Sequence, residues 1–106
     1  MKLVVIESPF ASGKFTMDEN ISYAKLCLKD SLKRGEAPIA SHLLFPQILN
    51  DKIPVERVQG IEAGHAWIIM ADILAVYIDH GVSIGMRDGM DVAIRNGVAI
   101  DIRKLV

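Results

Sequence analysis

The sequence has a single cysteine, Cys27, and it lacks long hydrophobic runs and an excess of charge of either sign. One cysteine cannot form a disulfide framework or a Cys-x-x-Cys metal knuckle. Twelve Lys and Arg residues against 13 Asp and Glu residues give a net charge of −1, which argues against a basic nucleic-acid-binding surface. The most apolar stretch, Ala66 to Ile78, is interrupted by Asp72 and is shorter than the roughly 20 residues of a membrane span. We therefore expect a cytoplasmic protein that binds neither membranes nor nucleic-acid polymers.

The 106 residues are 51% hydrophobic, a composition that excludes intrinsic disorder and favours a single folded domain over residues 1–106. This hydrophobic content is high for so small a chain, and it predicts an apolar surface that is buried between subunits. We expect a homodimer or a higher homo-oligomer.

Short apolar segments alternate with helical patterns along the chain. We predict strands at residues 2–7, 37–42, 72–78 and 98–103, and helices at 17–34, 54–70 and 84–96. Asp18 is the expected N-cap of the first helix and Ser83 that of the last, while residues 43–52 are expected to be irregular. The alternation predicts an α/β fold, in which a short parallel four-stranded sheet is flanked by about three helices in a flavodoxin-like, doubly wound three-layer sandwich.

Ligands of doubly wound sheets bind at the carboxyl ends of the strands, and polar residues gather at those positions. Glu7 ends an apolar run there, so its carboxyl is either an acid–base group with a raised pKa or the partner of a nearby Lys or Arg. Asp79 is either a turn former or a carboxylate above a pocket. His42 is either a hydrogen-bonding residue of this edge or a solvated side chain.

Two glycine-containing segments invite a phosphate-binding interpretation. Ser12-Gly13-Lys14 lacks the P-loop pattern, because Ser8 stands where the first glycine belongs and Phe15 where Ser or Thr should follow the lysine. The segment from Gly81 to Met86 joins a strand end to a helix start, so it is either an anion-binding turn or an ordinary capped helix. No His-x-x-x-His spacing is present, and we expect neither a metal nor an organic cofactor.

The residues at these strand ends resemble the nucleoside 2-deoxyribosyltransferase-like superfamily. The resemblance rests on Ser8-Pro9-Phe10 after the first strand, and on Asp79-x-Gly81-x-Ser83-x-Gly85-Met86 followed by Ala93 and Gly97. A small bacterial and phage branch is similar over most of the chain. The stretches that carry this closer similarity are Ala37-Pro38-x-Ala40-Ser41-His42-Leu43-Leu44, Gly60-Ile61-Glu62-Ala63-Gly64-x-Ala66-Trp67 and Gly85-Met86-x-x-Gly89.

The resemblance implies chemistry at the N-glycosidic bond of a nucleoside or nucleotide. By position, Asp79 would bind the sugar or assist the base, and the turn formed by Gly81, Ser83, Gly85 and Met86 would receive the 5′ group. The base or sugar would lie against a wall formed by Ser8, Pro9 and Phe10, with His42 in contact with the base.

The superfamily's nucleophilic glutamate is expected six residues after Ser83, where this chain has Gly89. A glycine cannot form a glycosyl ester, so double displacement from this position is excluded. The carboxylate must come from Glu7, from Glu62 or from a partner subunit, and Glu62 with Asp79 is the preferred pair. We therefore expect a hydrolase or a ribosyl or deoxyribosyl transferase. The alternative is a non-catalytic protein that binds or sequesters a nucleotide.

Overall fold

The computed structural model describes residues 1–11 and 13–106. Its helices and strands follow one another as β1 (Leu3–Glu7), α1 (Met17–Lys33), β2 (Ala37–Ile39), α2 (Ser41–Leu44), the 3-10 helix η1 (Phe45–Gln47), α3 (Pro54–Met70), β3 (Ile73–Tyr77), α4 (Ile84–Arg95) and β4 (Ala99–Arg103). Ser12, which belongs to the predicted turn after the first strand, lies outside the described residues.

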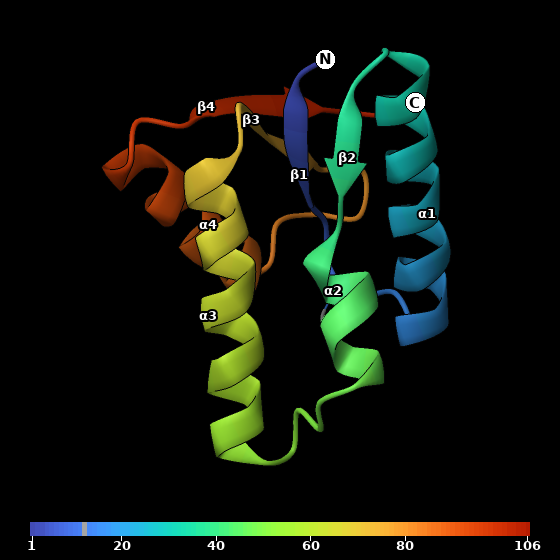
Figure 1. The fold of residues 1–106 in the computed structure, drawn as a ribbon. Coiled ribbons are helices and arrows are strands. Elements are labelled where there is room, and N and C mark those ends of the chain that lie inside the picture. The colour runs from blue at the N-terminus through green and yellow to red at the C-terminus, as the bar shows by residue number, and fades with distance from the viewer. Residues whose placement is uncertain (12) are drawn as a thin grey trace.

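The four strands form one parallel sheet in the order β2-β1-β3-β4, which confirms the predicted α/β fold (Figure 1). Helix α1 covers one face of this sheet, and α3 and α4 cover the other, so the molecule has three layers. The chain leaves β1 toward the first face and leaves β3 toward the second. The topological switch point therefore lies between the carboxyl ends of β1 and β3.

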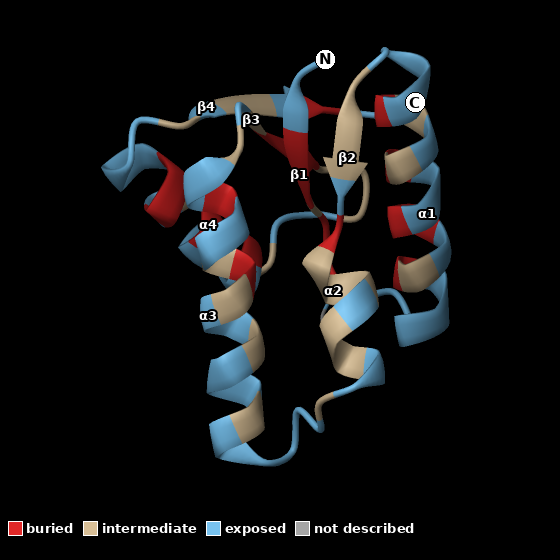
Figure 2. Ribbon diagram, viewed as in Figure 1, coloured by how far each residue is buried: buried red, intermediate tan, exposed pale blue. Residues whose placement is uncertain are grey.

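Each face of the sheet has its own apolar core, and buried residues follow the sheet-facing sides of the helices (Figure 2). Alternate residues of β1 divide between the two cores, as the period of a strand requires. Val4 and Ile6 pack on the side of α1, and Val5 packs on the side of α3 and α4. Glu7 follows Val5 by two residues and therefore points toward α3 and α4.

Three predictions about local structure are wrong. The second strand ends at Ile39 and not at residue 42, because Ser41 and His42 begin helix α2. Part of the segment 43–52 is helical, so four α-helices and one 3-10 helix are described where about three helices were expected. Thr16 caps α1 in place of Asp18, since its hydroxyl accepts the Glu19 N–H at 3.1 Å while the Glu19 carboxylate accepts the Thr16 N–H at 2.8 Å.

Helix α3 extends beyond the carboxyl edge of the sheet, and α2 and η1 pack beside it (Figure 1). Two glycines on α3 allow this contact. A Cβ at Gly64 would lie 2.9 Å from the Ser41 hydroxyl oxygen, and one at Gly60 would lie 3.3 Å from a methyl carbon of Leu49. Among the described residues, no helix is both long and apolar enough to cross a membrane.

Candidate functional site

Glu7 is the last residue of β1, and its carboxyl group occupies space that a side chain at position 89 would need. A Cβ built on Gly89 of α4 would overlap Glu7 Oε2 and would lie 3.3 Å from Ile68 Cδ1 of α3. The glycine on α4 therefore makes room for a carboxyl group that comes from β1. This contact lies at the carboxyl edge of the sheet, beside the topological switch point.

Burial and the negative charge of Asp88 together raise the pKa of Glu7 from its ordinary 4.5 to about 8. No ion pair to Glu7 is present in the part of the chain that the structure describes. Of the two interpretations of Glu7, the structure supports the carboxyl with a raised pKa. Glu7 is half-buried, so solvent still reaches it, and at neutral pH it holds a proton that it can donate.

Ser8, the residue after Glu7 in the chain, contacts His42, although 34 positions separate the two in the sequence. The Ser8 hydroxyl oxygen lies 2.8 Å from His42 Nε2. Burial lowers the pKa of His42 to about 4, so the imidazole is neutral at pH 7. A neutral imidazole and a hydroxyl form a polar pair that binds uncharged hydroxyl groups well and is too weakly basic for efficient proton abstraction.

Two further residues predicted to line the site follow Ser8 on the loop after β1. Pro9 is buried, and Phe10 is half-buried. The backbone carbonyl of Phe10 accepts a hydrogen bond from Asn20 Nδ2 of α1 at 3.1 Å, which fixes the loop against that helix.

Asp79 lies just after β3 and is held by hydrogen bonds from two other segments. Its carboxylate accepts the Tyr23 hydroxyl of α1 at 2.5 Å, the Leu105 N–H at 3.0 Å and the Val106 N–H at 3.3 Å. Burial alone would raise the pKa of Asp79, but these hydrogen bonds outweigh it and lower the pKa. Asp79 therefore ties α1 and the segment after β4 to the end of β3.

The turn from Gly81 to Met86 caps helix α4. Gly81 has φ of +88°, a conformation that other residues rarely adopt. The Ser83 hydroxyl accepts the Met86 N–H at 3.2 Å, and Met86 Sδ accepts the Ser83 N–H at 3.3 Å. Met86 is 2% exposed and its side chain belongs to the core, so its sulfur closes the turn from the inner side. Gly85 is exposed beside it. The capped-helix interpretation is confirmed, and anion binding by this turn stays a prediction.

Glu62 and Asp79 are not brought together. Glu62 is exposed on α3, two residues from both Gly60 and Gly64, so it points about 160° away from the α2-facing side of the helix. Asp79 bonds toward α1, on the opposite face of the sheet. The structure instead gathers Glu7 with Asp88, and Ser8 with His42, at the carboxyl end of β1.

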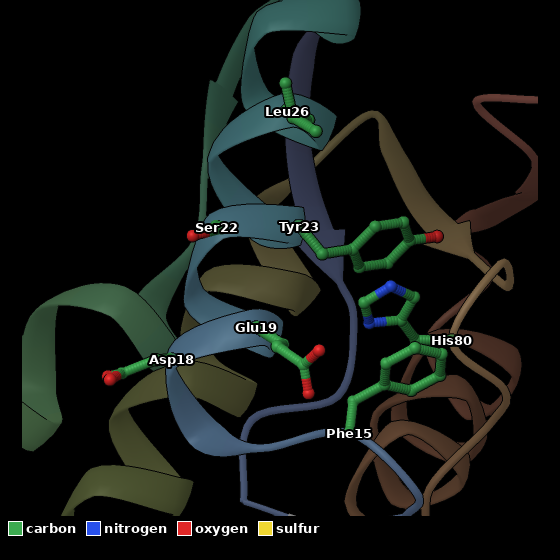
Figure 3. Close-up of a pocket in the computed structure, with 7 residues that line it drawn as sticks. All are labelled: Phe15, Asp18, Glu19, Ser22, Tyr23, Leu26 and His80. Atoms are coloured by element: carbon green, nitrogen blue, oxygen red, sulfur yellow. The ribbon is translucent and has the colours of Figure 1, made fainter.

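Three aromatic rings stack beside this edge, an arrangement that was not predicted from the sequence. His80 lies between Phe15, at 3.7 Å between ring centroids, and Tyr23, at 4.0 Å, and Figure 3 shows the three rings one above another. They border an open hollow of about 410 Å³ on the side of α1. A second hollow, of about 450 Å³, is lined by Phe10, Met17, residues 46–52 and Glu56. Ring stacking between distant segments leaves no periodic signal, so the sequence gives no means of finding it.

In the described part of the chain, no group of three or more His, Cys, Asp or Glu side chains is arranged to hold a metal ion. A comparison with curated proteins finds no match. Residues 2–103 match a family described as a domain of unknown function, DUF7768, and the chain belongs to this family.

Proposed function

We propose that this protein cleaves or transfers at the N-glycosidic bond of a nucleoside or nucleotide, with Glu7 as its catalytic acid. The proposal rests on one observation, the Glu7 carboxyl group lying against Gly89. In the superfamily that the sequence resembles, a glutamate at the position of Gly89 carries the reaction. Here β1 supplies a carboxyl group to nearly the same space.

The raised pKa of Glu7 defines which step it performs. A carboxyl group with a pKa of about 8 is protonated at neutral pH, and it donates its proton to the leaving base as the C–N bond breaks. The bonding electrons leave with the base, and positive charge develops on the anomeric carbon. The negative charge of Asp88, which already acts on Glu7, stabilises that charge. The Glu7 carboxylate then takes a proton from the water or acceptor hydroxyl that attacks this carbon, which restores the acid.

The remaining residues at this edge bind the substrate in the proposed reaction. The Ser8–His42 pair contacts sugar hydroxyls or the base, and Pro9 and Phe10 form the adjoining wall. Backbone groups around Gly81, Ser83 and Gly85 receive the 5′ group. No metal or organic cofactor enters this chemistry, and we propose that the protein acts in the cytoplasm.

A non-catalytic nucleotide-binding protein is the second candidate, and the state of Asp79 favours it. The carboxylate expected to assist the base or bind the sugar is engaged by Tyr23, Leu105 and Val106. A protein that only retains its ligand needs no second carboxylate in the site.

To test this proposal, the protein is incubated with a panel of nucleosides, nucleoside monophosphates and adenine dinucleotides, and the release of free base is measured by chromatography. We expect release by the wild type and a loss of about 100-fold or more in Glu7→Gln, which keeps the size of the side chain but cannot donate the proton. The double variant Glu7→Ala/Gly89→Glu returns a carboxyl group to the same space from α4, and we expect it to recover part of the activity.

Melting temperatures of the same mixtures separate the two candidates. A ligand at 100 times its dissociation constant adds about 2.7 kcal/mol to the free energy of unfolding. Stabilisation by a nucleotide with no released base would establish the binding protein. Base release that is equal in wild type and Glu7→Gln would overturn the assignment of Glu7.

A further inference from the structure

One face of helix α4 joins the turn that precedes the helix to the Glu7 carboxyl group. Gly85, Asp88 and Gly89 lie on this face, because residues three and four positions apart are neighbours on a helix. The Glu7 carboxyl group lies against Gly89, and the negative charge of Asp88 acts on it. A substrate group that reaches Gly85 is therefore one helical turn, roughly 5 to 6 Å, from Asp88.

The start of α4 has few donors left for a phosphate group. The Met86 N–H is donated to the Ser83 hydroxyl oxygen at 3.2 Å, and the Ser83 N–H to Met86 Sδ at 3.3 Å. The Arg87 N–H is donated to the Ser83 carbonyl oxygen at 3.1 Å. In the part of the chain that the structure describes, the N–H groups of Ile84 and Gly85 have no such partner. Two donors are enough for a hydroxyl group, whereas a phosphate group has three strong acceptor oxygens.

The positively charged side chains in the adjoining segments do not offset Asp88 on this face. Arg87 is exposed and follows Gly85 by two residues, so it leaves the helix about 160° away from that face. Lys14 comes just before α1, which covers the opposite face of the sheet. Lys104 follows β4, which lies two strands or about 10 Å from β1. Among the described residues, none of these three cations forms an ion pair.

We propose that the substrate is a nucleoside with a free 5′-hydroxyl group and not a nucleotide, and that Asp88 determines this preference. The inference rests on the proposed function, which places the 5′ group at the turn before α4. Glu7 becomes a carboxylate when it gives its proton to the leaving base. A 5′-phosphate near Gly85 would then be a third negative group beside Glu7 and Asp88, and like charges at this distance repel. A 5′-hydroxyl adds no charge.

Base release from each nucleoside and from its own 5′-monophosphate tests the preference. We expect kcat/KM of the wild type to be higher for the nucleoside by about 10-fold or more. Asp88→Asn should lower this ratio by about threefold or more. The variant also changes the proton affinity of Glu7, but Glu7 serves both substrates, so this effect cancels in the ratio. Asp88 is exposed, and its replacement by the isosteric amide should leave the fold intact.

Asp91→Asn is the matched control for the loss of charge. Asp91 is also exposed on α4 but follows Gly89 by two residues, so it points about 160° away from the face that meets Glu7. This variant should keep the wild-type ratio. Equal ratios in the wild type and Asp88→Asn, or equal changes in Asp88→Asn and Asp91→Asn, would remove Asp88 as the residue that determines the preference.

Melting temperatures give a second measurement that needs no turnover. A nucleoside should stabilise the wild type more than the same concentration of its monophosphate, and the difference should narrow in Asp88→Asn. Faster base release from the monophosphate would overturn the preference and leave the proposed function standing. Greater stabilisation by nucleosides without any released base would do the reverse. If none of these compounds released base or stabilised the protein, both would be wrong.

Discussion

The Glu7 proton links the site to the stability of the fold. The folded protein holds this proton up to about pH 8, whereas an ordinary glutamate releases it near 4.5. Between these values the folded state binds more protons than the unfolded chain, so the free energy of unfolding falls as pH rises through this window. Glu7→Gln has no proton to lose and should escape that fall.

We therefore expect Glu7→Gln to be more stable than the wild type above pH 8, by on the order of 2 kcal/mol once partial solvent access to the carboxyl group is taken into account. Near the ordinary pKa of a glutamate the two proteins should be almost equally stable. Urea unfolding of both proteins across this pH range measures the difference. Curves that stay parallel would show that Glu7 is an ordinary surface carboxylate.

His42 has the opposite dependence on pH. Its pKa is about 4 in the folded protein against an ordinary 6.5, so the unfolded chain binds more protons between these values. The free energy of unfolding should therefore fall as pH drops through this window, by on the order of 2 kcal/mol in total. His42→Gln should lack this acid-side loss. Ser8→Ala keeps the imidazole, so its free energy of unfolding should still fall at acid pH. Because this variant lacks the hydrogen bond to His42, it should also be less stable than the wild type by about 1 kcal/mol at every pH.

At the scale of single elements, apolar periodicity predicted the long helices and the buried strands. The prediction of a helix at residues 54–70 agrees with α3 at both ends, because Pro54 marks its start and a buried strand follows closely. The failure at Ser41 and His42 has a physical cause. A short apolar segment fits a strand and a helix equally well, and the choice depends on packing against Gly64 and Ser8, which are distant in sequence.

The site was less predictable than the fold for the same reason. Glu7, Ser8 and His42 were identified from their places at strand ends, but the contact between Glu7 and Gly89 depends on how α4 lies over β1. The only sign of this contact in the sequence is Gly89 itself. A glycine lowers helix propensity, so a glycine inside a strongly helical segment indicates that close packing requires it. The pairing of Glu62 with Asp79 failed because α3 directs Glu62 outward and α1 engages Asp79.

The contact between α4 and β1 can be measured with a double-mutant cycle. In a Glu7→Ala background, Gly89→Ala should stabilise the protein by up to about 1 kcal/mol, since alanine is the better helix former and the Ile68 methyl group, 3.3 Å from the new Cβ, has to shift only slightly. In the wild-type background the added Cβ displaces the Glu7 carboxyl group, and this gain should disappear. The expected coupling is about 1 kcal/mol by chemical denaturation. Equal effects in the two backgrounds would mean that the two residues do not touch.

The N-terminus of α1 offers a matched pair of variants. Thr16 makes both hydrogen bonds of the capping box with Glu19, whereas Asp18 is an acidic residue of the first turn, where its charge is favourable toward the helix dipole. We expect Thr16→Ala to cost about 1 kcal/mol of unfolding free energy and Asp18→Ala only about 0.3 kcal/mol. Thermal unfolding of both variants ranks them. A larger loss of stability in Asp18→Ala than in Thr16→Ala would mean that Asp18 caps the helix.

At the scale of the whole molecule, polar groups join elements that the two apolar cores leave separate. Arg103 of β4 is buried and bonds Glu36, just before β2, through two contacts of 2.8 Å, and its guanidinium also reaches the Tyr77 hydroxyl at 3.2 Å. Tyr77 in turn donates to Asp30 of α1 at 2.7 Å. The network spans the α1 face of the sheet from one edge strand to the segment before the other.

Asp79 connects the same layers at the carboxyl edge, and its structural and catalytic roles can be distinguished. If it acts as an anchor, Asp79→Ala should cost about 2 to 3 kcal/mol, and Tyr23→Phe, which removes one donor and leaves the carboxylate, about 1.5 kcal/mol. Base release, measured well below both melting temperatures, should then be nearly unchanged in either variant. If Asp79 also acts on the substrate, Asp79→Ala should lose activity while Tyr23→Phe keeps it. Because three donors from two segments already engage this carboxylate, we expect the first result, which leaves proton donation to Glu7.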